Sequence, residues 1–162
     1  MIDYEFLGLP LHILLVHFVV IAVPAAALCL VLATAWPAAR RRLGVVTPII
    51  ALVTMIVVPI TTDAGEWLEA RVHITPLIAA HAALGLTLMP WAVAVFIVAV
   101  LQWAWFRYGR SRMLAKASRV TITVILAAAV AVTAAGSVIT VVQIGEAGAR
   151  AVWTGNFDTT SQ

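Results

Sequence analysis

Four histidines, His12, His17, His73 and His81, are the side chains of this chain best suited to bind a metal. His12 and His17 open one long apolar run and His81 lies in another, where a lipid-facing helix would carry no imidazole. A polar group inside hydrocarbon is costly without a partner, so an intramembrane histidine usually faces one. Imidazole is the commonest metal ligand in proteins and also binds haem iron axially. The histidines therefore indicate a metal or haem site within a membrane.

Two predicted helix starts place His17 and His81 at similar depth. Pro10 suits the first turn of one helix, and Pro76 follows a threonine N-cap at the start of another. We expect both histidines to point into the bundle and to hold haem b between the first and third spans. Gly85, one turn after His81, would make room for the edge of the macrocycle.

The same pair also has a structural interpretation, in which each ring bonds a backbone carbonyl freed by a proline. Pro24, Pro48 and Pro59 lie within the apolar runs and each removes one helical hydrogen bond. Bonds of this kind would fix the register of the helices without any cofactor.

A second, mixed nitrogen and oxygen site for zinc, copper or iron is predicted near the outer surface. His12 lies about 140° around its helix from His17, at 100° per residue, so the two rings point in different directions. The residues of this site would be His12 and His73 with Glu66, Glu146 or Asp63. No HxxH or HExxH spacing supports it, and the alternative is ordinary solvation of exposed groups.

Composition indicates a membrane protein. The 162 residues are 64% hydrophobic and only 10% charged, with a mean hydropathy of +1.08. Cys29 is alone, which excludes an intrachain disulfide and any cysteine-based metal motif. No hydrolase, transferase or nucleotide-binding motif is present, which argues against an enzyme acting on its own. The basic residues form no aromatic-interleaved surface, so we expect no nucleic-acid partner.

The apolar runs predict a single all-α transmembrane domain over residues 1–162, with four spans at about 9–36, 43–62, 76–106 and 120–144. Polar residues 63–71 predict a short interfacial helix between spans two and three, and the polar tail over residues 145–162 is expected to be loose at its end. Eight of the ten Lys and Arg follow spans one and three, and all seven acidic residues lie on the other side. The positive-inside rule then predicts an antiparallel bundle in the cytoplasmic (plasma) membrane with both termini outside.

Three short motifs resemble an uncharacterised family of small four-helix bacterial membrane proteins, domain of unknown function 2231. They are Gly8-Leu9-Pro10-Leu11-His12 with Val16-His17-Phe18, Thr62-Asp63-Ala64-Gly65-Glu66, and Ile144-Gly145-Glu146-Ala147-Gly148-Ala149-Arg150-Ala151-Val152-Trp153. The resemblance covers nearly the whole chain. Fusions of family members to cytochrome c or Rieske-type domains imply a respiratory or redox setting. In the family pattern a proline often replaces Ile13, and a histidine often replaces Glu146.

These observations predict a membrane protein that binds haem b, or a bare transition metal, for electron transfer or to anchor a redox partner at its outer face. One alternative is a cofactor-free accessory subunit of the membrane, with histidines that stabilise the bundle and an acidic outer face that docks another subunit. The other is a transporter or channel, which would need an oligomer because four helices leave one copy little room.

Overall fold

The computed structural model describes residues 3–109, 111 and 115–155. Arg110 and Arg112 of the second basic segment, and Asp158 of the C-terminal tail, lie outside the described residues. Four helical segments are long and apolar enough to cross a membrane: Leu11–Ala35, Val46–Glu69, Pro76–Gly109 and Lys116–Trp153. The chain therefore has the helices of a multi-pass membrane protein.

A small antiparallel hairpin precedes the first span and consists of β1 (Glu5–Phe6) and β2 (Leu9–Pro10). Leu7 and Gly8 connect the strands with φ angles of 51° and 79°, the left-handed values that a type I′ turn requires. The Leu11 amide donates a hydrogen bond to the Tyr4 carbonyl at 2.8 Å, which ties the hairpin to helix α1 (Leu11–Ala35). The predicted helix start near residue 9 is therefore two residues early, because Pro10 belongs to the hairpin.

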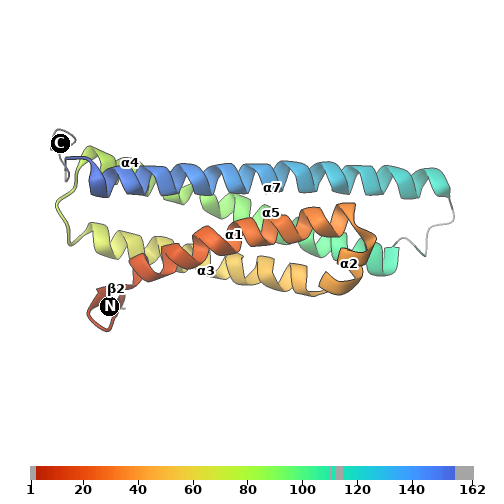
Figure 1. Ribbon diagram of the computed structural model, residues 1–162, viewed down its shortest axis with the longest axis horizontal. Helices are drawn as coiled ribbons and strands as arrows, with labels where there is room; N and C mark the ends of the chain where they lie inside the picture. The colour runs from red at the N-terminus through yellow and green to blue at the C-terminus, as the bar shows by residue number, and fades with distance from the viewer. Residues whose placement is uncertain (1–2, 110, 112–114, 156–162) are drawn as a thin grey trace, which may run out of the picture.

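The other elements are α2 (Pro37–Leu43), α3 (Val46–Glu69), α4 (Pro76–Leu86), α5 (Leu88–Ala104), the π-helix η1 (Trp105–Gly109) and α7 (Lys116–Trp153). The long helices lie side by side along the long axis of the molecule (Figure 1). The N-terminal hairpin and the end of α7 are at one end, and α2 is at the other. Helices α1 and α5 each pack against both α3 and α7, and α4 packs against α3 and α7.

Three boundaries differ from the sequence-based prediction. Residues 63–71 form no separate interfacial helix, because α3 continues to Glu69. The last span does not end at residue 144, since α7 continues to Trp153 with an Arg150–Glu146 ion pair between successive turns. The third span is divided at Thr87, three residues before Pro90. Proline has no N–H, so the Leu86 carbonyl lacks the helical bond that residue 90 would otherwise donate.

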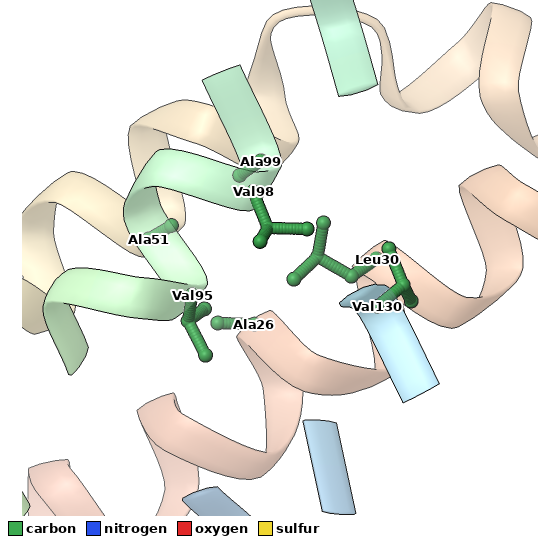
Figure 2. Packing of buried hydrophobic residues seen from close by; sticks show 7 residues of the cluster. All are labelled: Ala26, Leu30, Ala51, Val95, Val98, Ala99 and Val130. Atoms are coloured by element: carbon green, nitrogen blue, oxygen red, sulfur yellow. The ribbon is translucent and has the colours of Figure 1, made fainter. Parts of the chain in front are cut away.

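The interior of the bundle is filled mainly by alanine and valine. One buried cluster contains Ala26, Leu30, Ala51, Val95, Val98, Ala99 and Val130, which reach it from α1, α3, α5 and α7 (Figure 2). A second contains Val19, Val23, Val58, Leu88, Ala92 and Val141. Small side chains let helix backbones approach closely, which drives association where lipid gives no hydrophobic advantage to packing.

Candidate functional site

His12 lies in the first turn of α1 and is half-buried against α3. Its Nδ1 atom is 2.8 Å from the Thr61 carbonyl oxygen. The ring also lies directly on Gly65, where an added Cβ would be 2.9 Å from both Cε1 and Nδ1. Real Cβ atoms essentially never come this close, so the glycine is required for the position of the ring.

His81 repeats this arrangement between α4 and α7. Thr75 caps α4 with a 3.3 Å bond from the Ile78 amide, which confirms the predicted helix start at Pro76. The Nδ1 atom of His81 is 3.0 Å from the Ile144 carbonyl oxygen. An added Cβ on Gly148 would lie 3.0 Å from Cε1 of the ring.

The two contacts are equivalent in the sequence as well as in space. In each, the carbonyl that bonds the histidine is four residues before the glycine that the ring covers. Each glycine ends an acidic-Ala-Gly tripeptide, Asp63-Ala64-Gly65 on α3 and Glu146-Ala147-Gly148 on α7. The hairpin of α1 with α3 and that of α4 with α7 therefore carry the same histidine–glycine contact.

The two histidine rings also meet each other, and we call this pair the paired histidine site. The ring centres of His12 and His81 are 6.2 Å apart, and the ring planes are at 79°. Because a carbonyl oxygen only accepts, Nδ1 must carry the proton in both rings. A neutral imidazole of this tautomer keeps its lone pair on Nε2, and no described residue forms a hydrogen bond with Nε2 of either ring.

The expectation that His17 points into the bundle with His81 is wrong. His17 is exposed on the outside of α1, and its Nδ1 donates to the Ile13 carbonyl of its own helix at 2.6 Å. His12 is the second residue of α1, whereas His81 is the sixth residue of α4, yet their rings meet. Helix α4 therefore begins roughly 6 Å, or four residues, farther out than α1, at 1.5 Å per residue.

The predicted outer metal site is not assembled either. The described residues contain no group of three or more His, Cys, Asp and Glu that could hold a metal ion. His73, Glu66 and Glu146 are exposed, and the Glu146 carboxylate accepts from the Arg150 guanidinium. Gly85, which was predicted to make room for the edge of a haem, is half-buried, and a Cβ there would meet no atom within 4 Å.

The paired histidine site would offer two nitrogen ligands to one metal. The ring centres are 6.2 Å apart, close enough for both imidazoles to reach the same ion through metal–nitrogen bonds of about 2.0–2.1 Å. A metal-binding histidine typically donates its other N–H to a carbonyl or carboxylate, which fixes the tautomer and ring orientation. The bonds to Thr61 and Ile144 fulfil this role.

Sequence reasoning missed Gly65 and Gly148 and the carbonyls of Thr61 and Ile144. A signal was present, because an acidic-Ala-Gly tripeptide occurs near the end of span two and again near the end of span four. No protein-family model, curated protein or solved structure with which the chain was compared matches it.

Proposed function

We propose that this chain is a redox protein of the membrane that binds a metal centre between α1 and α4 through Nε2 of His12 and His81. The observation that carries the proposal is the close pairing of two imidazoles from different helices, each with Nδ1 bonded to a carbonyl. The predicted position between the first and third spans is retained, but His12 replaces His17 as the ligand on α1.

Haem b is the group that two histidines suit best. Haem iron needs only axial ligands from the protein, whereas a zinc site normally has three or four protein ligands. The described residues offer no third His, Cys, Asp or Glu at the pair. Bound haem would supply one-electron transfer, and the two rings would hold and orient it. A single zinc, copper or iron ion completed by water or a partner's side chain is the second choice.

The distribution of charge supports an orientation and a docking face. In the described part of the chain, acidic side chains are on the N-terminal hairpin segment and near the ends of α3 and α7, at the end that carries the histidines. Arg40, Arg41 and Arg42 lie on α2 at the other end. We therefore propose an antiparallel bundle with α2 on the cytoplasmic side of the plasma membrane and both termini outside. The acidic outer end would dock a basic redox partner.

Spectroscopy of the purified protein tests the proposal. Protein made with ample haem and metals should show a Soret band, and both His12→Ala and His81→Ala should abolish the low-spin spectrum because one axial ligand is lost. His17→Ala and His73→Ala are matched controls and should keep it, since both side chains are exposed. Wild-type protein that stays colourless and free of metal under these conditions would refute the proposal.

The cofactor-free alternative is also favoured by an observation, because the bonds to Thr61 and Ile144 join neighbouring helices by themselves. It predicts that haem and metal salts leave the unfolding transition unchanged. Under our proposal a ligand at a hundred times its Kd should stabilise the protein by about 2.7 kcal/mol. The alanine and valine interior does not favour a transporter or channel within one copy.

A further inference from the structure

A pocket of about 550 Å³ lies beside α2, and α2 is at the end of the molecule opposite the N-terminal hairpin (Figure 1). We call it the basic-end pocket. Its lining residues come from the end of α1, from α2 and the turn after it, from the start of α3 and from the end of α5 with η1: Ala33, Arg40, Arg41, Gly44, Val45, Thr47, Gln102, Trp103, Phe106 and Arg107. Three arginines are therefore among the lining residues, and none of the described residues that line the pocket is acidic.

Hydrogen bonds and a ring contact hold the Arg40 side chain in place beside the pocket. Its guanidinium donates to the Ala33 carbonyl and, at 2.6 Å, to the Thr34 carbonyl, two of the last carbonyls of α1. It also lies 3.5 Å from the centre of the Phe106 ring. Arg40 is thus held between α1 and η1, whereas Arg41 and Arg107 are exposed at the rim.

Two polar residues that line the pocket, Gln102 and Thr47, are buried. Gln102 is 3% exposed and donates to the Leu30 carbonyl at 3.1 Å and to the Thr34 hydroxyl. Thr47 is 2% exposed, and in the described part of the chain its hydroxyl is the one buried side-chain group without a hydrogen-bond partner. A buried polar group without a partner costs stability. Because Thr47 is one of the lining residues, a ligand oxygen that reached its hydroxyl would be favoured.

We propose that the basic-end pocket binds a phosphate group. A phosphate oxygen accepts hydrogen bonds from guanidinium and hydroxyl groups, and its charge would be balanced by Arg41 and Arg107. Basic pockets between membrane helices bind the head groups of anionic lipids, so one source of the phosphate is phosphatidylglycerol in the adjacent leaflet. The other source is a soluble phosphate. The site is independent of the paired histidine site and does not rest on the function proposed for it.

Native mass spectrometry of the delipidated protein tests this, with phosphatidylglycerol, phosphatidylcholine and inorganic phosphate as separate probes. Arg41→Gln and Arg107→Gln should each weaken binding about fivefold, which corresponds to about 1 kcal/mol per arginine. Arg42→Gln is the matched control, because it removes the same charge from the next position of α2 but does not line the pocket. Thr47→Val keeps the side-chain shape and should weaken binding as well, while the helical circular dichroism stays unchanged.

Competition between the probes distinguishes a lipid head group from a soluble phosphate as the ligand. Preference for phosphatidylglycerol that survives excess inorganic phosphate supports a lipid head group, and displacement by inorganic phosphate supports a soluble ligand. Equal binding of phosphatidylglycerol and phosphatidylcholine, with no binding of inorganic phosphate, would overturn the proposal. Phosphatidylcholine also carries a phosphate, but its choline cancels the negative charge that Arg41 and Arg107 should balance. Equal losses in Arg41→Gln and Arg42→Gln would also overturn it, because net charge alone would then explain the affinity.

Discussion

Replacing Gly148 by alanine tests the packing of His81 without reference to any cofactor. The new Cβ would lie 3.0 Å from Cε1 and 3.2 Å from Nδ1 of the ring, which is also bonded to the Ile144 carbonyl. The ring must therefore move and strain or lose that bond. Forcing an extra methyl group into a packed contact typically costs about 1–3 kcal/mol.

Gly145 provides the matched control on the same helix, one turn away. A Cβ at Gly145 meets no atom within 4 Å, so Gly145→Ala should only add helix propensity, about 1 kcal/mol of stabilisation. Because both variants share the propensity gain, their difference isolates the steric cost. We expect Gly148→Ala to be less stable than Gly145→Ala by about 1–3 kcal/mol.

Unfolding by sodium dodecyl sulfate, followed by far-ultraviolet circular dichroism, gives the two free energies of unfolding in mixed micelles. Gly65→Ala should show at least the same loss, since its Cβ would lie 2.9 Å from two atoms of the His12 ring. Equal stabilities of Gly148→Ala and Gly145→Ala would show that the His81 ring does not pack against Gly148 of α7 as described.

Three further outcomes follow. Gly136→Ala should destabilise the protein by about 1–3 kcal/mol and change tryptophan fluorescence, because its Cβ would lie 2.2 Å from the Trp91 ring. His17→Ala should change the free energy of unfolding by less than about 0.5 kcal/mol, as an exposed side chain bonded only to its own helix; a larger loss would place His17 inside the bundle. The orientation can be tested with Arg42→Cys in a Cys29→Ala background, which leaves one cysteine in the chain. This cysteine should react with a membrane-impermeant maleimide only after the membrane has been opened. Reaction in intact cells would show the opposite orientation.

The four spans were predictable because each is a long apolar run, and the start of α4 was predictable because Thr75 and Pro76 are local signals. The end of α7 at Trp153 was not predictable in the same way. The residues after Ile144 were interpreted as a polar tail, but the alanines among them and the Arg150–Glu146 pair favour helix, and α4 packs against α7.

The sequence-based prediction paired the wrong histidine, His17, with His81. The reason is the axial offset between α1 and α4. Counting residues from the two prolines placed His17 level with His81. The hairpin at the N-terminus delays α1 to Leu11, and α4 begins farther out, so His12 reaches the level of His81 instead. The axial offset between two helices depends on packing across the bundle, which local sequence signals do not specify. The haem prediction itself stays a prediction, now attached to a different residue on α1.

Each histidine–glycine contact is internal to one helical hairpin, His12 with α3 and His81 with α7. As chains generally fold from the N-terminus during synthesis, the first hairpin can close its contact before α4 has been made. The second hairpin then closes its own. Neither event sets the 6.2 Å between the two rings, which is fixed only when the two hairpins associate. Two correctly formed but wrongly associated halves would keep both hydrogen bonds and still lack the paired histidine site, so a ligand that joins the rings would report on assembly of the whole bundle.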